Sequence, residues 1–287
     1  MCRFLAYAGT PILMDQLIFQ PQNSLIHQSY HALERQDPVN GDGFGIGWYV
    51  PDVSPEPVRY VSVKPAWNDR NLRSIATKTK AGCFFAHVRD ASVGAVCESN
   101  CHPFHYGPFL MMHNGRIEGF KKIKRTIINL LSENVFEWLS GETDSEHFFA
   151  LFLNCLFAVK KVRYSTEDLV AALFKSIAIL KKIFCETQPQ AHFYLNLAIT
   201  DGRDIIACRY DTNVHVASPT LYYSSGGFFQ CEDGVCRMAD TGGSEKSVLV
   251  VSEKLTNRRD EWHKIPEEHL VIIRPDLQVH LMPLKIE

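Results

Sequence analysis

The order of the predicted strands and helices is the feature that most restricts the fold of this 287-residue chain. Apolar runs bounded by turn residues predict strands in the first 113 residues and again after residue 193. Between these two blocks, helical spacing predicts helices at about 118–131, 145–159 and 166–185. Because the helices follow one another and do not alternate with strands, the order favours an α+β layered fold over a parallel βαβ sheet.

The individual strands are predicted from short alternating or continuous apolar segments. They are 2–8, 43–50, 58–64, 82–89, 109–113, 193–200, 204–210, 214–217, 247–252, 269–274 and 278–284. A proline-rich piece, 51–57, and a glycine-rich piece, 224–243, are interpreted as long surface loops. Strand patterns continue on both sides of these pieces and no internal repeat is visible, so we expect one domain over residues 1–287.

Composition and charge exclude several classes of protein. Hydrophobic residues make up 46% and charged residues 22%, which is ordinary for a globular chain. A net charge of −2 argues against a general nucleic-acid or anionic-membrane binder. The longest apolar stretch, 148–159, is too short to cross a bilayer, and no signal-peptide pattern precedes the first strand. We therefore expect a cytoplasmic protein whose partner is a small molecule or another protein.

Nine cysteines are distributed along the chain. Without a secretion signal, a disulfide framework is not expected. Cys97 and Cys101 stand close before His102 and His105, which suggests a zinc site as one alternative. The C-x3-C-H-x2-H spacing matches no common zinc finger, and no C-x-x-C pair exists in the sequence. We therefore expect reduced thiols, no metal and no cofactor.

Cys2 stands directly behind the initiator methionine and in front of an apolar strand. If Met1 is removed, this residue carries both a thiol and a free α-amine. A thiol attacks only as thiolate, and an α-amine that titrates near about 8 can take its proton. The alternative is a small buried cysteine in a first strand, with no chemical role.

Three later features could complete a site around such a thiol. Arg89 ends a strand, where its guanidinium could hold a carboxylate, although an ion pair with Asp90 or another acid is equally compatible. Asn114-Gly115 is typical of a turn but could also form an oxyanion hole. Asp144 opens a helix, where it could cap the helix or bind an ammonium group. Together, Arg89 and Asp144 would hold the two α-groups of an amino acid.

Several motifs occur together in a characteristic order. They are Cys2 behind Met1, AHVR-x-AS at 86–92, HPF at 102–104, HNG at 113–115 and ETDSE at 142–146. This set resembles the class II glutamine amidotransferases of the N-terminal-nucleophile hydrolases. The runs MCRFLAY, NGDGFGIGWY at 40–49 and VVSEKLT at 250–256 resemble a narrower group. That group includes the amidohydrolase subunit of the fungal glutathione-degrading complex and the ergothioneine-pathway γ-glutamyl hydrolase.

The resemblance implies a four-layer αββα sandwich with two facing antiparallel sheets. It also implies a role for each matching residue. Cys2 would be the nucleophile and its own α-amine the base, with Asn114 and Gly115 as the oxyanion hole. The implied substrate contacts are Arg89 to the glutamyl carboxylate, Asp144 to its ammonium group, His102 beside the carboxylate, and Ser92. The residues implied to lie near the site are Asp42, Gly43, Ser252 and Glu253.

Two positions depart from the sugar-amidating relatives, which carry arginine at the position of Asn40 and tryptophan at that of Asp90. We therefore carry over from the resemblance only the hydrolysis of the amide bond, and not the transfer of ammonia to a sugar. The resemblance implies cleavage of the γ-glutamyl amide bond of glutamine or a γ-glutamyl peptide through a thioester on Cys2. One alternative is a glutaminase subunit that delivers ammonia to a separate synthase partner. Another is a non-catalytic regulatory subunit that binds an amino acid.

Overall fold

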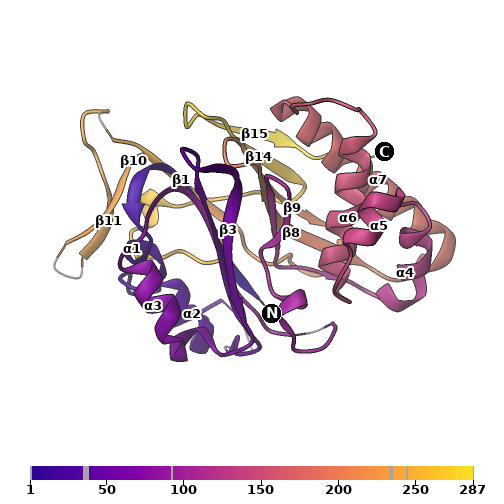
Figure 1. Ribbon diagram of the computed structural model, residues 1–287, viewed down its shortest axis with the longest axis horizontal. Helices are drawn as coiled ribbons and strands as arrows, with labels where there is room; N and C mark the ends of the chain where they lie inside the picture. The colour runs from indigo at the N-terminus through magenta and orange to yellow at the C-terminus, as the bar shows by residue number, and fades with distance from the viewer. Residues whose placement is uncertain (1, 35–38, 92, 233–234, 244, 287) are drawn as a thin grey trace.

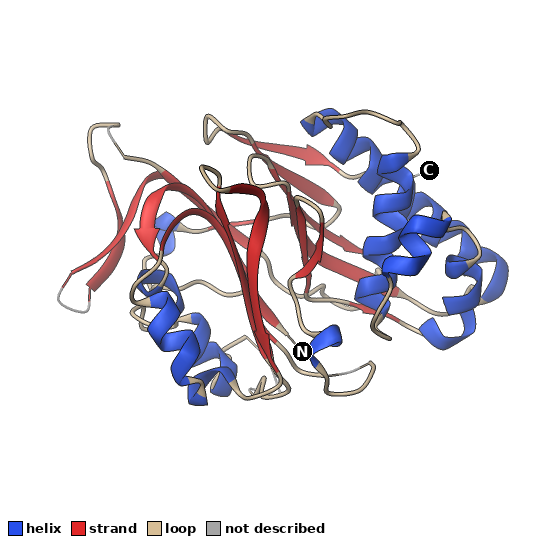
Figure 2. Ribbon diagram, viewed as in Figure 1, coloured by secondary structure: helices blue, strands red, loops and turns tan. Residues whose placement is uncertain are grey.

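Two antiparallel β-sheets face each other and carry helices on their outer surfaces (Figures 1 and 2). The computed structural model describes residues 2–34, 39–91, 93–232, 235–243 and 245–286. From one side to the other, the layers are helices, sheet, sheet and helices. The predicted α+β class and the four-layer αββα sandwich are confirmed.

The first sheet holds the start of the chain. In the described residues its strand order is β11-β10-β12-β1-β4-β2-β3, and β13 pairs with β10. The strands are β1 (Arg3–Leu13), β2 (Phe44–Val50), β3 (Ser54–Ser62), β4 (Lys80–Val88), β10 (Tyr222–Glu232), β11 (Val235–Ala239), β12 (Ser247–Val251) and β13 (His263–Lys264). Within β1, Leu5 pairs with Val251 of β12 and with Ala86 of β4. The segment that follows Cys2 is thus a central strand, which holds the chain end in place.

The second sheet lies opposite, with the order β15-β14-β9-β8-β6-β5 and β7 paired with β8. Its strands are β5 (Phe104–Tyr106), β6 (Phe109–His113), β7 (Arg116–Ile117), β8 (Phe193–Thr200), β9 (Ile205–Asp211), β14 (His269–Ile273) and β15 (Val279–Pro283). The strand that ends at His113 lies directly before the Asn-Gly pair.

Alternating side chains of β1 contribute to two different parts of the core. Phe4 and Ala6 pack between the two sheets with Phe85 and Leu110, whereas Tyr7 belongs to the layer beneath the helices of the first sheet. Successive side chains of a strand point to opposite faces, so a strand covered on both faces is apolar throughout. This explains the nearly continuous apolar run FLAYA.

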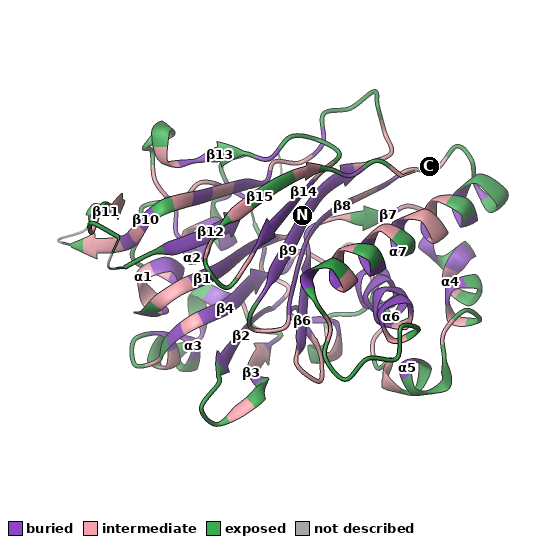
Figure 3. Cartoon of the chain, turned by 90° about the horizontal axis from the view of Figure 1, so that it is seen from above, coloured by how far each residue is buried: buried purple, intermediate pink, exposed green. Residues whose placement is uncertain are grey.

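Short helices cover the first sheet and longer helices cover the second. The helices are α1 (Asp15–Ile18), α2 (Leu25–Tyr30), α3 (Arg70–Ala76), α4 (Phe120–Ile128), α5 (Glu133–Trp138), α6 (Asp144–Phe157) and α7 (Thr166–Thr187). The three helices predicted from spacing correspond to α4, α6 and α7. Helix α6 is buried on almost every side (Figure 3), which accounts for apolar residues around its whole circumference. No described helix is both long and apolar enough to cross a membrane.

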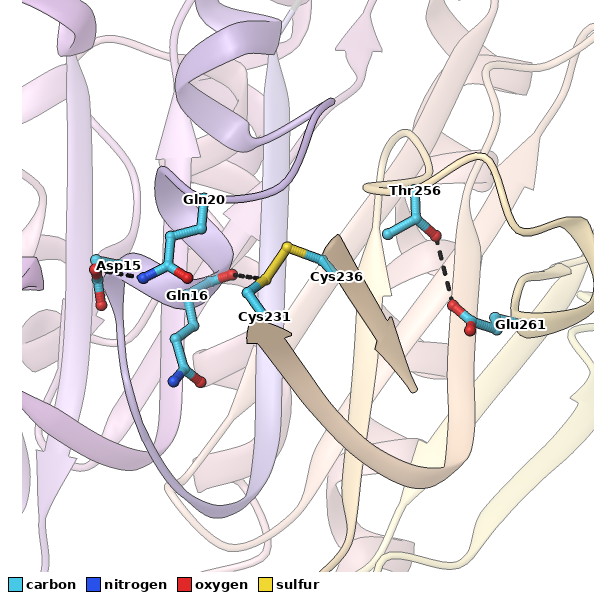
Figure 4. The surroundings of a disulfide bond; sticks show 7 residues. All are labelled: Asp15, Gln16, Gln20, Cys231, Cys236, Thr256 and Glu261. Atoms are coloured by element: carbon cyan, nitrogen blue, oxygen red, sulfur yellow. Dashed lines mark hydrogen bonds between the residues drawn. A yellow bond between two sulfur atoms is a disulfide. The ribbon is translucent and has the colours of Figure 1, made fainter. Parts of the chain in front are cut away.

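The segment 224–243 is not the surface loop that we predicted. It contains most of β10 and all of β11, which form a hairpin at the edge of the first sheet. Cys231 and Cys236 pair across this hairpin and form a disulfide (Figure 4), so the expectation of reduced thiols is wrong for these two residues. The prediction failed because a glycine-rich composition hid the alternation of the strand.

Other boundaries also differ from the predictions. Strand β3 begins at Ser54, so the proline-rich segment contributes to an edge strand and its loop is shorter than expected. The predicted strand 214–217 is absent, and Val214 and Val216 are 87% and 64% exposed. Helices α2, α3 and α5 were missed, because six or seven residues are too few to establish a helical period.

We expect Phe152→Ala to destabilise the protein by about 3–5 kcal/mol, because it opens a cavity in the fully buried face of α6. Phe136→Ala is the matched control, since Phe136 of α5 is 50% exposed and should lose far less. Urea unfolding of both variants measures the difference. Equal losses in the two variants would contradict the described core.

Candidate active site

The Cys2 thiol lies against the backbone that follows β4. The amide N–H of Asp90 donates to Cys2 Sγ at 3.4 Å, and the thiol lies 3.5 Å from the carbonyl oxygen of Asp90. Burial raises the pKa of the Cys2 thiol, while the positive charges of Arg89 and Arg3 act in the opposite direction. Because burial outweighs these charges, the thiol needs a base in order to attack.

Ser252 connects the strand of Cys2 to Asn114. Its Oγ accepts a hydrogen bond from the amide of Phe4 at 3.0 Å and one from Asn114 Nδ2 at 3.3 Å. The amide of Asn114 donates to the carbonyl of Asn196 at 2.7 Å, which fixes the backbone at the end of β6. Asn114 and Ser252 therefore lie near the start of β1. The oxyanion role of Asn114 and the near-site place of Ser252 stay predictions.

Gly115 occupies a place with no room for a side chain. A Cβ at this position would collide with the ring of His113 and with the carbonyl oxygen of Tyr194. Glycine lets the backbone turn closely past both groups. The backbone can thus place the N–H group of residue 115 next to Asn114 only if residue 115 is glycine.

Arg89 is a buried cation without an acidic partner among the described residues. It is 2% exposed, and its Nη1 and Nη2 donate to the carbonyls of Ala95 and Val93 at 3.1 Å each. None of the described acidic side chains forms an ion pair with it, so the alternative of a structural ion pair with Asp90 finds no support. A buried charge is costly unless it is paired, which makes this guanidinium a candidate anion site.

Asp42 and Gly43 support the segment that carries Arg89. The Asp42 amide donates to the Arg89 carbonyl at 3.0 Å, and the Arg89 amide donates to the Gly43 carbonyl at 2.8 Å. The Asp42 carboxylate accepts from the amide of Ala91 at 2.8 Å. Gly43 has φ +118°, where a Cβ would also meet Cys101 Sγ at 2.8 Å. Both residues therefore contact the segment that carries Arg89, and their predicted place near an active site stays a prediction.

Asp144 is the first residue of α6 and is 4% exposed. Its carboxylate accepts from the amides of Ile117 at 2.8 Å and of Ser145 at 3.0 Å. The side chain that caps α6 belongs to Thr143, so capping does not require Asp144. In the described part of the chain, Asp144 forms no ion pair with lysine or arginine, and it is a candidate for binding a cation.

A chain of hydrogen bonds joins the Arg89 segment to the start of α6. The Ala95 carbonyl, which accepts from Arg89, also accepts from Asn100 Nδ2 at 2.8 Å. Asn100 Oδ1 in turn accepts from the amide of Glu142 at 2.8 Å. Asn100 was not among the predicted residues, because an asparagine between two cysteines shows no distinct signal. Through these hydrogen bonds, Asn100 links the loop that binds Arg89 to the segment that precedes Asp144.

His102 is buried and stacks on a second histidine. Its ring centroid lies 4.2 Å from that of His87 and 4.5 Å from that of Phe104. Burial lowers the pKa of His87 to about 3 and that of His102 well below its usual range. Both rings are therefore neutral near pH 7, and their lowered pKa values make them weak proton acceptors.

The side chains that could have formed a zinc site contact different partners. Cys101 Sγ lies 3.6 Å from the Ser62 carbonyl, and His105 Nε2 contacts the Gly107 carbonyl at 2.7 Å. Cys97 Sγ lies 3.2 Å from Ser99 Oγ. Over the described ranges of the chain, no three histidine, cysteine or acidic side chains gather in a way that could hold a metal ion.

The remaining predicted residues give a mixed result. Glu253 is buried and binds Arg3. A charged residue that follows Cys2 at the start of an apolar strand is a sequence signal for Arg3 that our predictions missed. Ser92 lies outside the described residues. Asn40, which stands in place of an arginine, is buried, and its side chain and backbone amide donate to the carbonyls of Gln28 and Ser29. Here Asn40 holds α2 against the loop and carries no charge.

Comparison with known proteins places this arrangement in a family. The profile described as "Glutamine amidotransferases class-II" matches residues 20–284. The chain belongs to the class II glutamine amidotransferases. It is therefore an enzyme of this type, and the resemblance of its sequence motifs is confirmed.

Relatives of this class II glutamine amidotransferase include curated proteins and solved structures. Probable glutamine amidotransferase DUG3 of Saccharomyces cerevisiae is 35% identical over 295 residues, which is 96% of this chain and 82% of the relative. γ-Glutamyl-hercynylcysteine sulfoxide hydrolase of Mycolicibacterium smegmatis is 36% identical over 121 residues, 41% of this chain and 52% of that protein. A glutamine aminotransferase class-II domain protein from Silicibacter pomeroyi matches with TM-score 0.68 and 25% identity, covering 98% of this chain and 99% of its own.

If the amide of residue 115 is an oxyanion-hole donor, we expect Gly115→Ala to abolish at least about 99% of the activity. Such a donor contributes on the order of 100-fold, and the new methyl group collides with His113 and Tyr194. Steady-state kinetics with a γ-glutamyl substrate measures the loss. Near-normal turnover of a folded Gly115→Ala variant would contradict the described turn.

We also expect His87 to make the protein sensitive to acid. The unfolded state binds a proton below about pH 6.5, whereas folded His87 stays neutral down to about pH 3, so stability is lost as the pH falls between these values. Between pH 6.5 and pH 5 this contributes about 2 kcal/mol. Urea unfolding of His87→Gln should show a shallower dependence on pH than the wild type. Parallel curves for the two proteins would refute the assignment.

Proposed function

We propose that this protein hydrolyses a γ-glutamyl amide bond through a γ-glutamyl thioester on Cys2. The observation that carries the proposal is that Arg89 and Asp144 are buried, opposite charges, neither of which has an ion-pair partner among the described residues. Arg89 fits the α-carboxylate of a glutamyl group, and Asp144 fits its α-ammonium group. The chain of hydrogen bonds through Asn100 supports both positions.

In the proposed first step, the sulfur of Cys2 attacks the amide carbon of the γ-glutamyl group. The carbonyl oxygen takes the negative charge and accepts hydrogen bonds from Asn114 Nδ2 and the amide of Gly115. The intermediate collapses when its C–N bond breaks, and the leaving amine takes a proton. Water then adds to the thioester, releases glutamate and restores the thiol.

The base in this mechanism is the α-amine that Cys2 gains when Met1 is removed. The hydrogen bonds of Cys2 Sγ to described residues involve only backbone atoms of Asp90. Burial lowers the pKa of His87 and of His102, so both rings are weak bases. An amine on the same residue can take the thiol proton, directly or through one water, and pass it to the leaving group.

The names of the relatives support two kinds of leaving group, namely the amine of a γ-glutamyl conjugate and the ammonia of glutamine. One relative is named a hydrolase of a γ-glutamyl conjugate and another a probable glutamine amidotransferase. We favour hydrolysis of a γ-glutamyl conjugate, with delivery of ammonia to a partner subunit as the alternative. Comparing glutamine with γ-glutamyl dipeptides, with and without co-purified protein, separates the two. Turnover of glutamine that depends on a co-purified protein would favour the alternative.

We expect Cys2→Ala to release no measurable glutamate from any γ-glutamyl compound, because the nucleophile is absent. An electrophilic glutamine analogue should label wild-type Cys2 at equimolar ratio and leave the variant unlabelled. Cys185→Ala is the control, since this thiol is exposed in α7 and should affect neither result. Turnover or specific labelling that survives in Cys2→Ala would exclude the mechanism.

We expect Arg89→Lys to raise KM for a γ-glutamyl substrate by about 10-fold or more, because an ammonium cannot reproduce the planar fork that holds a carboxylate. A substrate analogue that lacks the α-carboxylate should be turned over equally poorly by wild type and variant. If the variant discriminates between substrate and analogue as strongly as the wild type does, Arg89 does not bind this carboxylate.

A further inference from the structure

Directly behind the nucleophile, a buried ion pair joins Arg3 to Glu253. Arg3 Nε donates to Glu253 Oε1 at 2.6 Å, and both side chains are 2% exposed. The two residues come from opposite ends of the sequence, one at the start of β1 and the other just after β12. Arg3 stands in a strand whose next residues are all apolar, so its burial there needs an explanation.

Each member of the pair makes a second set of contacts. Arg3 Nη1 donates to the carbonyl oxygen of Cys2 at 2.8 Å. Glu253 accepts the amide of Leu33 at 2.9 Å and the amide of Glu34 at 3.2 Å. The carboxylate of Glu253 thus binds both the side chain of Arg3 and the backbone of the segment 33–34, which lies 30 residues after Arg3 in the sequence. Through Arg3, it also fixes the carbonyl group of the nucleophile.

Fixing this carbonyl has a stereochemical consequence for a terminal residue. Two of the four groups on the Cys2 Cα are then anchored, namely the carbonyl carbon through Arg3 and the Cβ through the contacts of Sγ with Asp90. The other two groups on this Cα are the amine and a hydrogen. Because the residue has the L configuration, only one arrangement of these two groups is possible once the first two are fixed. An anchored carbonyl and an anchored sulfur therefore determine where the amine points.

We propose that Arg3 and Glu253 form a positioning pair that orients the α-amine of Cys2 toward its own thiol and the leaving group. This inference rests on the proposed function, which makes the amine the base. Neither residue touches the substrate, so both act through Cys2. The pair affects the chemical step, while Arg89 and Asp144 provide binding.

A purely structural role is the competing explanation. Buried ion pairs are seldom more stable than apolar pairs of similar volume, because desolvation offsets their attraction. If the pair served stability alone, an uncharged replacement should function as well as the native residues. This contrast defines the experiment.

The test compares four variants of the full-length protein. Arg3→Met with Glu253→Gln removes both charges and keeps similar volumes. The glutamine retains one acceptor oxygen, which can replace one of the two Glu253 oxygens that accept from the amides of Leu33 and Glu34. Arg3→Lys keeps the positive charge near Cys2 but loses the fork that reaches both Glu253 and the Cys2 carbonyl. Glu267→Gln is the matched control, because Glu267 pairs with the buried Arg209 at 3.1 Å in a different part of the fold. Cys2→Ala reports on the proposed function itself.

For each variant we measure kcat and KM for a γ-glutamyl substrate and the midpoint of thermal unfolding. For the wild type and every variant that keeps Cys2, we also measure the rate at which iodoacetamide alkylates Cys2 as a function of pH. We expect kcat to fall on the order of 100-fold in the double variant and in Arg3→Lys, with KM within about threefold. The pH profile of alkylation should change in both, while Glu267→Gln matches the wild type.

Two outcomes would overturn the positioning role. A double variant with wild-type kcat and alkylation profile would show that the pair is structural, whatever its unfolding midpoint. The same conclusion follows if Arg3→Lys is folded and fully active. Failure of the proposed function is distinguishable, because then Cys2→Ala would keep the activity or the wild type would show none. In that case the alkylation profiles still test the orientation of Cys2.

Discussion

The antiparallel pairing of β1 with both of its neighbours is the constraint on which the site depends. Arg3 pairs with Val88 of β4, and Leu5 pairs with Val251 of β12. Because the neighbours run in the opposite direction, the start of β1 lies beside the ends of β4 and β12. This register brings together, at one end of the three strands, Cys2, the segment that carries Arg89, and the residues Ser252 and Glu253. A slip of one residue would turn every side chain of β1 to the wrong face.

The second sheet supplies the other half of the site. Asn114 and Gly115 follow β6, and Asp144 opens α6, which packs over the same sheet. Ser252 is the direct link between the halves, because its hydroxyl accepts from the amide of Phe4 and from Asn114. In the proposed mechanism the two sheets therefore carry different tasks. The first holds the proposed nucleophile and anion site, and the second holds the proposed oxyanion donors and cation site.

Much of the fold could be predicted from the sequence, and the exceptions have physical reasons. Long periodic segments such as α6 and α7 were placed within a few residues, because their patterns extend over several turns. The β10–β11 hairpin was missed because glycine and serine conceal its alternation, and its disulfide joins cysteines that no local pattern connects. For the site, local spacing identified Arg89, Asn114 and Asp144 as candidates. Arg3 and Asn100 were missed. The partner of Arg3, Glu253, lies 250 residues away, and an asparagine between two cysteines shows no distinct signal.

The central claim is that Cys2 becomes the chain terminus and carries the γ-glutamyl group during turnover. The most direct measurement is mass spectrometry of protein quenched with acid while it consumes a γ-glutamyl substrate. We expect a peptide that begins at Cys2, lacks Met1 and carries one γ-glutamyl group on the sulfur. A fully active protein that retains Met1, or a γ-glutamyl group found on another residue, would contradict it.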